Sequence, residues 1–582
     1  MKELYRLIPY LKRYKKKLIL GLIVVTIANL CATYVPRLVG TTIDMIVDGN
    51  YDMNKILLNI LYILLLTAFS GYFMFLTRRM IIVASREIEY DLRKDLLNSI
   101  QSQSMNFFHK NPTGNLMAHA TNDIPAAREF LGPAIMYSAN TVTTFTFALY
   151  FMLTLNPEIT MIGLIPLPFI AYATYLVGKK IHIAFKDVQS KFAELTTQAQ
   201  ESISGVRVIR AYTREFYEYT RFAAMSKEYL FKNLRLARIE AIFMPLLMVL
   251  VGLSHIAVLA YGGNLVIDGR ASLGDLTQFF IYLELLVWPV AAIGWVTNLI
   301  QRGAASSARL GKLLEEIPEI ADNSETDNSI NKIEGEVEFD SINYKYPSTE
   351  NIVLDDISFR ISKGNTLGIV GSVGTGKSTI INLLLRLFET NSGAIKIDGH
   401  NLKSIPIDLL RKHISVVPQE PFLFSETIKG NISFGNPAAT MEEIIAVAEK
   451  CKLHEEVLTF QNGYDTMLGE RGITLSGGQK QRVSIARAMI TNPSILILDD
   501  SLSAVDSATE SFVLGNLKEF MKDRTTIIIS HRISTVMNAD NIILLDKGKI
   551  AESGNHEQLV TLNGKYANIF RLQQLAKEIE EL

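Results

Sequence analysis

The sequence predicts a multidomain membrane protein: an all-α domain of six transmembrane helices with long cytoplasmic helical extensions, followed by an α/β domain built around a phosphate-binding loop. Three observations support this prediction. Long apolar runs recur six times before residue 302. A polar stretch at 321–329 then interrupts the apolar pattern. Beyond it, strands rich in β-branched residues alternate with amphipathic helices, which is typical of an α/β domain.

Composition supports a membrane location and excludes some partners. Of the 582 residues, 48% are hydrophobic and 20% are charged, an apolar average that soluble proteins of this size rarely reach. The formal net charge of −1 gives no reason to expect a nucleic-acid partner. Cys31 and Cys451 are far apart in the chain and indicate neither a disulfide framework nor a zinc site. Residues 1–11 lack the features of a signal peptide and predict an amphipathic helix at the membrane surface.

The six apolar runs predict six membrane-spanning helices within a transmembrane domain at 1–320. Each reaches the roughly 20 residues that cross the hydrocarbon core. The alternative, buried helices of a large soluble protein, would leave little polar surface to face water. The predicted helices are at about 18–46, 54–85, 130–156, 158–180, 241–267 and 275–302. A linker at 321–334 and a second domain at 335–582 follow.

Basic residues predict how the chain is oriented. Seven Lys and Arg precede the first span, seven lie between residues 78 and 129, and twelve lie between 179 and 240. The other connections carry few, so the N-terminus, both long connections and the second domain are predicted to be cytoplasmic. The chain is therefore expected to be a multi-pass protein of the cytoplasmic membrane, in contact with its lipids.

The two long cytoplasmic connections look helical and could project about 35–45 Å beyond the bilayer. Breaks at 111–114 and 204–205 interrupt them near their middles. We expect short helices just after the breaks, near 115–125 and 206–214, where they could contact the second domain. The alternative is that the breaks are simple turns.

A phosphate-binding loop lies between a predicted strand at 365–370 and a helix at 380–387. Its glycines let backbone N–H groups converge on phosphate oxygens, and the helix N-terminus adds positive potential. Lys377 is expected to bridge the β and γ phosphates, and the Ser378 hydroxyl to reach Mg²⁺. The expected ligands are therefore ATP and Mg²⁺. The loop consists of Gly371, Ser372, Val373, Gly374, Thr375, Gly376, Lys377, Ser378 and Thr379.

A buried strand at 494–500 ends in two aspartates, Asp499 and Asp500. Asp499 emerges at the carboxyl edge of a parallel sheet, where it could hold Mg²⁺ through water. Asp500 stands where a general base or a water-orienting carboxylate would sit. The second domain is therefore predicted to be a P-loop ATPase.

With these motifs in place, residues 335–575 resemble the nucleotide-binding domain of ATP-binding-cassette (ABC) transporters. The resemblance implies that Tyr346 stacks on adenine, that Gln419 reaches Mg²⁺, that His531 contacts the γ-phosphate, and that Ser503 and Asp506 touch the opposite subunit. The segment at 469–472 resembles a cross-subunit loop. The family signature that acts on the partner's ATP is Leu475, Ser476, Gly477, Gly478 and Gln479.

Six spans fused ahead of one such domain resemble an exporter half-transporter, which implies a dimer and makes the two short helices its coupling helices. In this family the residue at Asp500 is usually a glutamate. The missing methylene withdraws the carboxylate by about 1–1.5 Å, and such a displacement can cost ~100-fold in rate. The chain thus resembles the Asp-containing subunit of bacterial heterodimeric multidrug exporters, whose partner has the glutamate and an altered signature. A homodimer, in which aspartate serves adequately, is the alternative.

The transported substrate is less well defined by sequence. Polar and aromatic side chains inside the fifth and sixth spans are candidates for a transport pathway, because such groups inside a membrane are usually functional. An acid among aromatic rings would suit amphipathic cations; the alternative is that these residues face another helix or the outer interface. A lipid flippase, a peptide exporter and an ATP-gated channel remain alternatives to multidrug export. The candidates are His255, Glu284, Trp288, Trp295 and Asn298.

Overall fold

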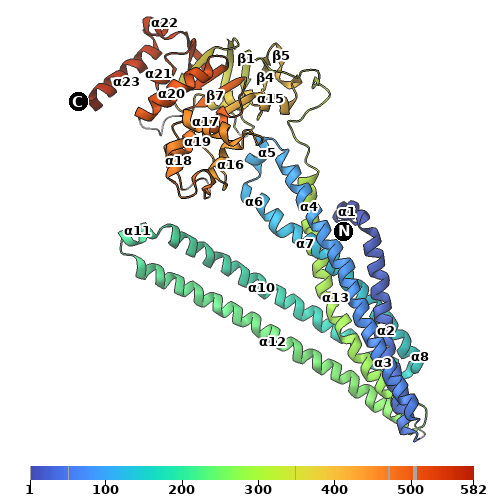
Figure 1. Ribbon diagram of the computed structural model, residues 1–582. Coiled ribbons are helices and arrows are strands. Elements are labelled where there is room, and N and C mark those ends of the chain that lie inside the picture. The colour runs from blue at the N-terminus through green and yellow to red at the C-terminus, as the bar shows by residue number, and fades with distance from the viewer. Residues whose placement is uncertain are drawn as a thin grey trace. The chain divides into compact units, whose positions relative to one another are not determined.

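The computed structural model describes residues 2–49, 52–347, 349–469, 472, 474–501 and 507–581 (Figure 1). The chain forms two compact units. The membrane unit comprises Met1–Gln101 and Thr113–Glu316, and the ATPase unit comprises Ser102–Pro112 and Ile317–Leu582. The sequence predicts a boundary at residue 320, and by its contacts the short segment Ser102–Pro112 groups with the ATPase unit.

The membrane unit is entirely helical. Several of its helices follow one another without a break, joined by π-helical turns (η2, η3 and η4). Its elements are η1 (Lys2–Leu7), α1 (Ile8–Arg13), α2 (Lys15–Val47), α3 (Met53–Thr77), η2 (Arg78–Ile82), α4 (Val83–Gln101), α6 (Thr113–Ala118), η3 (His119–Asp123), α7 (Ile124–Glu129), η4 (Phe130–Ala134), α8 (Ile135–Leu155), α9 (Pro157–Leu164), α10 (Leu167–Ser204), α11 (Val206–Ala211), α12 (Glu215–Ile267) and α13 (Leu273–Leu314).

Among the described residues, five helices are long and apolar enough to cross a membrane, whereas the sequence predicts six. The predicted span at 130–156 is helical in η4 and α8 but falls outside the five. Hydroxyl and amide side chains make it less apolar, and they have partners inside the unit. Asn29 of α2 donates to the Thr143 hydroxyl at 2.6 Å and to the Asn140 carbonyl at 3.3 Å.

Two groups of helices pack within this unit. Helices α10 and α12 run side by side and are joined by α11, with Ala184, Val188 and Leu236 buried between them (Figure 1). Helix α13 packs on α2 and α8, where Phe279 and Tyr282 are fully buried. The Tyr282 hydroxyl donates to the Thr33 carbonyl at 2.9 Å, which satisfies a polar group that would otherwise be unpaired in an apolar core.

A short helix, α5 (Met105–Lys110), precedes the break at 111–114, and α6 follows it. The range 115–125, where the sequence predicts a coupling helix, begins in α6 and lies inside the continuous run from α6 to α8. Pro112 has no amide hydrogen and disfavours a helical conformation at Asn111, so the helix ends there and the next begins at Thr113. The second short helix, α11, lies within the predicted range 206–214.

Helix α5 packs inside the ATPase unit. Its Phe107 is buried, and the ring of His109 lies 5.8 Å from that of Phe388. The Ser104 hydroxyl and the Asn106 amide donate to one carboxylate oxygen of Glu319, at 3.1 and 2.9 Å. These contacts fix α5 to the chain just before the predicted linker and to the segment after the phosphate-loop helix.

The ATPase unit contains two sheets. A six-stranded sheet has the order β10-β9-β3-β8-β7-β6 and is parallel except for β10; a four-stranded antiparallel sheet has the order β2-β1-β4-β5. The strands are β1 (Val337–Tyr344), β2 (Leu354–Ile361), β3 (Thr366–Gly371), β4 (Ser392–Ile397), β5 (His400–Asn401), β6 (Ile414–Val417), β7 (Ile495–Asp499), β8 (Thr525–Ile529), β9 (Asn541–Asp546) and β10 (Lys549–Gly554). The helices are α14 (Lys377–Leu384), α15 (Ile407–His413), α16 (Ile428–Ser433), α17 (Met441–Lys450), α18 (His454–Thr459), α19 (Gly477–Met489), α20 (Ser507–Met521), α21 (Ile533–Val536), α22 (His556–Thr561) and α23 (Lys565–Glu581), with 3₁₀ turns η5 (Leu402–Ser404) and η6 (Gly463–Asp465).

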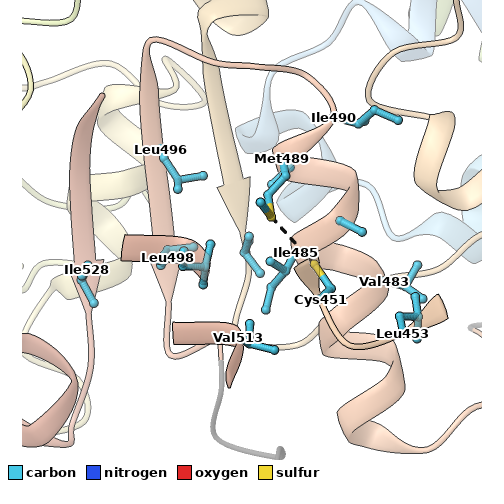
Figure 2. Packing of buried hydrophobic residues seen from close by; sticks show 14 of the residues in the cluster. Cys451, Leu453, Val483, Ile485, Met489, Ile490, Leu496, Leu498, Val513 and Ile528 are labelled. Atoms are coloured by element: carbon cyan, nitrogen blue, oxygen red, sulfur yellow. Dashed lines mark hydrogen bonds between the residues drawn. The ribbon is translucent and has the colours of Figure 1, made fainter. Parts of the chain in front are cut away.

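A buried apolar cluster holds α19 against the six-stranded sheet (Figure 2). Ile485 and Met489 of α19 pack with Leu496 and Leu498 of β7 around the fully buried Cys451. The Cys451 sulfur lies 3.8 Å from that of Met489, and burial raises the pKa of the Cys451 thiol to about 12. Cys451 is thus a core residue. The cluster also fixes the position of α19, whose N-terminus carries the signature.

Candidate nucleotide site and transmembrane groove

The phosphate loop leaves β3 and enters α14 in a shape that only glycine accommodates. Gly374 and Gly376 have φ values of +83° and +100°, which side chains rarely tolerate. A Cβ atom at Gly371 would lie 2.6 Å from the Leu545 carbonyl oxygen. The loop therefore keeps its backbone free to approach a ligand closely, and its N–H groups precede the positive end of α14. These features fit the phosphates of a nucleotide.

Lys377 and two oxygen-bearing side chains complete this end of the site. The Lys377 ammonium donates to the Gly371 and Ser372 carbonyls at 2.7 and 2.8 Å, and burial lowers its pKa. The Ser378 hydroxyl donates to Asp499 at 3.3 Å. Burial raises the pKa of Asp499, and the charge of Asp500 raises it further. A cation beside the Ser378 hydroxyl and the Asp499 carboxylate would therefore be favourable, because it stabilises the ionised carboxylate. Hydroxyl and carboxylate oxygens are ligands that Mg²⁺ prefers.

Asp500 is held by four neighbours, one at its backbone and three at its carboxylate. Its backbone is left-handed, with φ of +46°, and its N–H donates to the Ile529 carbonyl at 2.8 Å. One carboxylate oxygen lies 2.7 Å from Nδ1 of His531 and 3.5 Å from the Gln419 amide; the other accepts from Ser530 at 3.5 Å. The structure thus brings together Asp500, His531 and Gln419, which lie far apart in the sequence.

Tyr346 lies at the other side of the site. Its hydroxyl is 3.1 Å from the Thr379 hydroxyl, and its ring meets that of Phe388 edge-on at 5.3 Å. A cleft of about 420 Å³ connects these groups. It is lined by Tyr346, Val353, Val373, Gly374, Gly376, Lys377, Ser378, Thr379, Gln419, Asp499, Asp500, Ile529, Ser530 and His531. Val353, Ile529 and Ser530 were missed by sequence reasoning, because none of them belongs to a motif.

The signature does not line this cleft. Ser476 caps α19, where its hydroxyl accepts from the Gln479 N–H at 3.3 Å and the Gln479 side chain accepts from the Ser476 N–H at 2.9 Å. Such a capping box presents the helix N-terminus in a defined geometry. Gln479 also donates to Glu456 at 2.9 Å. The predicted contact loop with Ser503 and Asp506 lies outside the described residues, as do positions 470 and 471 of the predicted cross-subunit loop.

Four of the five candidate residues in the membrane unit line one groove between α12 and α13, of about 720 Å³. They are His255, Glu284, Trp288 and Trp295, and Glu284 is the one acid among its described lining residues. Asn298 lies instead in an adjoining groove of about 520 Å³, which shares Trp295 and also contains Lys179. The rings of His255 and Phe280 lie 5.3 Å apart, and those of Trp295 and Tyr137 lie 4.8 Å apart.

A P-loop ATPase unit joined to a unit of apolar helices defines a membrane-bound ATPase. Comparison with known proteins shows the family to which the chain belongs. Residues 18–290 match the ABC transporter transmembrane region, and residues 354–503 match the ABC transporter ATPase domain. The chain is 38% identical over 567 residues to the probable multidrug resistance ABC transporter ATP-binding/permease protein YheI of Bacillus subtilis, covering 97% of each chain. It is 36% identical over 547 residues to the multidrug resistance-like ATP-binding protein MdlA of Escherichia coli, covering 94% of this chain and 92% of MdlA.

The fold is similar to that of a bacterial Atm1-family ABC exporter with ATP bound, with a TM-score of 0.79, 26% identity, and coverage of 97% of this chain and 98% of that one. The chain belongs to the ABC transporter family. It is a multi-pass membrane protein and an ATP-driven exporter.

Proposed function

We propose that this protein exports amphipathic and hydrophobic compounds across the cytoplasmic membrane by alternating access. The observation that carries the proposal is the groove between α12 and α13, where Glu284 lies among Trp288, Trp295 and His255. A carboxylate beside aromatic faces favours the cationic end of an amphipathic molecule, and the apolar lining favours its hydrophobic part. The similarity to YheI and MdlA, both named for multidrug resistance, supports the same substrate class.

Replacing Glu284 with Gln tests this proposal. Losing an interaction of about 1 kcal/mol corresponds to about a fivefold loss of affinity, so efflux of a cationic dye should slow by about that factor while efflux of a neutral dye is retained. Efflux is measured from dye-loaded vesicles. Glu240→Gln is the matched control, because Glu240 is an exposed acid on the same helix as His255. Unchanged efflux of the cationic dye by Glu284→Gln would refute the role of this groove.

The geometry of the nucleotide site supports a separate role for each group of its residues. The loop Gly371–Thr379, including Lys377, would bind the phosphates, Tyr346 would hold the adenine, and Ser378, Gln419 and, through water, Asp499 would hold Mg²⁺. MgATP, when bound, supplies the phosphoanhydride bond whose cleavage drives transport. His531 contacts the terminal phosphate, and Asp500 orients water. Helix α11 and the first long connection, either at α5 or at the predicted coupling helix near 115–125, pass the movement of the ATPase units to the membrane helices.

The protein acts in this proposal as one half of a heterodimer. Ser476 does not line the chain's own cleft, so a second subunit must supply the signature for it. Asp500 carries a short side chain that is already engaged with His531, Ser530 and Gln419, which supports slow hydrolysis at this site. The partner would then carry a glutamate at the equivalent position and an altered signature. The intact signature of this chain would complete the partner's faster site.

A further inference from the structure

The C-terminal helix α23 is anchored firmly at its beginning. The N–H groups of Lys565 and Tyr566 donate to the two carboxylate oxygens of Glu552, and Lys565 also pairs with Asp546. The Tyr566 ring is fully buried, and its hydroxyl lies 2.8 Å from Nδ1 of His556. Residues at intervals of three, four and seven share one helix face, so Gln573 continues the face that Tyr566 buries. The helix thus holds Gln573 in a defined place.

Gln573 uses both ends of its amide on the segment that carries His531. Its Nε2 donates to the His531 carbonyl at 2.7 Å, and its Oε1 accepts from the Ile533 N–H at 2.8 Å. Ile533 begins α21, and the first N–H groups of a helix have no partner within it. Arg532, at the cap position, provides no side-chain hydrogen bond. Gln573 therefore caps α21 from a distant part of the chain.

We propose that Gln573 is a positioning residue for His531. The two hydrogen bonds bracket Arg532 and fix the backbone on which the imidazole stands, 2.7 Å from the Asp500 carboxylate. Two other contacts of this segment do not involve that carbonyl: Arg532 pairs with Glu510 at 3.5 Å, and the Arg532 N–H donates to the Ser530 hydroxyl at 3.0 Å, which closes a turn around His531. Neither holds the His531 carbonyl. The inference depends on the role proposed for His531 at the terminal phosphate.

Displacement of a catalytic group by about 1 Å can cost ~100-fold in rate, so partial release of His531 should lower turnover by about tenfold. The contacts of the phosphate loop do not involve Gln573, so the KM for ATP should change by less than about twofold. Gln573→Met removes both hydrogen-bonding atoms at similar length. Gln573→Glu keeps the acceptor for Ile533 and places a second oxygen against the His531 carbonyl. Gln574→Met is the control, since Gln574 is the exposed next residue of α23.

The test uses the full-length chain in lipid nanodiscs, with and without Asp500→Glu, and measures release of labelled phosphate. Each Gln573 variant is also combined with His531→Ala. If Gln573 acts through His531, adding Gln573→Met to His531→Ala should change kcat by less than about twofold. The proposal would be overturned if the losses of kcat from Gln573→Met and His531→Ala multiplied in the double variant. It would also be overturned if Gln574→Met lowered kcat as much as Gln573→Met does. If Asp500→Glu fails to raise turnover, the proposed role of Asp500 is wrong. The turnover of the Gln573 variants can still be compared with that of chains carrying Gln573, both with and without Asp500→Glu.

A second measurement does not depend on turnover. The Ile533 amide hydrogen is donated to Gln573, so Gln573→Met should accelerate its exchange with deuterium by about tenfold, whereas exchange in α19 stays unchanged. Exchange of the peptide spanning 531–536 is compared in the wild-type chain, Gln573→Met and Gln574→Met. Unchanged exchange in this peptide would overturn the proposal.

Discussion

Asp500 is the residue on which the proposed unequal dimer depends. Its carboxylate is drawn to His531 Nδ1 at 2.7 Å, and a glutamate would extend about 1–1.5 Å further into the cleft. We expect Asp500→Glu to raise ATP turnover of the full chain by about tenfold or more, because mispositioning of this order can cost ~100-fold. Phosphate release at saturating ATP measures the effect. Asp500→Asn is the control and should not raise turnover; brisk turnover by the wild-type chain alone would contradict the prediction.

At the same scale, sequence predicts site residues where the function lies in a continuous motif. The phosphate loop, Asp499 and Asp500 sit at strand ends, and the sheet brings them to one cleft with Gln419 and His531. Gln573 was not predictable in this way. It is an ordinary glutamine in a polar helix, and only the tertiary structure places its amide against His531 and Ile533. A motif contains residues whose function depends on the local backbone. A residue that supports the site from a distant element belongs to no local sequence pattern.

Among the elements, η3 and α13 are joined on the cytoplasmic side of the spans by an ion pair in which the Asp123 carboxylate is buried and the Arg309 guanidinium is half-exposed. Asp123 of η3 accepts from Ser306 at 2.8 Å and from Nε of Arg309 at 2.9 Å, and lies 2.6 Å from Nδ1 of His119. Burial acts to raise the pKa of Asp123, but the hydrogen bonds from Arg309, His119 and Ser306 outweigh it and leave the pKa below its usual value. Folding therefore stabilises the ionised carboxylate.

Asp123→Ala should destabilise the membrane unit by about 1–3 kcal/mol, because it leaves Ser306 and Arg309 without their acceptor. Because the pKa is lowered on folding, this contribution is complete above about pH 4, the ordinary value for aspartate, and is lost as the pH falls through the lower folded value. Thermal unfolding in detergent at pH 7 and at decreasing pH measures it. Asp187→Ala, at an exposed aspartate of α10, is the control. Equal melting of the two variants at pH 7 would contradict the prediction.

The elements also show how far sequence reasoning reaches. Apolar runs and glycine-rich turns predict most helices, because burial and backbone freedom act locally. Helix α8 lies in the predicted range 130–156, but the hydrogen bond from Asn29 to Thr143 that joins it to α2 could not be predicted, because the two residues are remote in sequence. The short helix α5 before the break at Asn111 and Pro112 was not predicted, because the break separates two helices and sequence reasoning considered only the one that follows it.

In the whole molecule, the chain passes between its two units three times, at 101–102, 112–113 and 316–317. The first two passages bracket α5, and the third follows α13. A displacement of the ATPase unit is therefore transmitted covalently to α4, to α6 and to α13, all of which continue into membrane helices. The hydrogen bonds of Ser104 and Asn106 to Glu319 join α5 to the chain just after α13. In the proposed function, a movement of α5 would therefore be shared with the chain just after α13.

Substitutions at Asn106 and Asn115 distinguish coupling through α5 from coupling through the segment at 115–125, which the sequence predicts. Asn106→Ala removes a hydrogen bond to the Glu319 carboxylate, worth about 1 kcal/mol or more, so stimulation of ATPase by a transported substrate should fall about fivefold while basal turnover is retained. Asn115 is an exposed asparagine of α6, in the range first predicted for this coupling helix, and Asn115→Ala should leave stimulation unchanged. Both variants are measured in proteoliposomes with and without an amphipathic cation, alongside efflux. If Asn115→Ala abolished stimulation and Asn106→Ala did not, movement would enter the membrane helices through α6, and α5 would serve only to tether the chain.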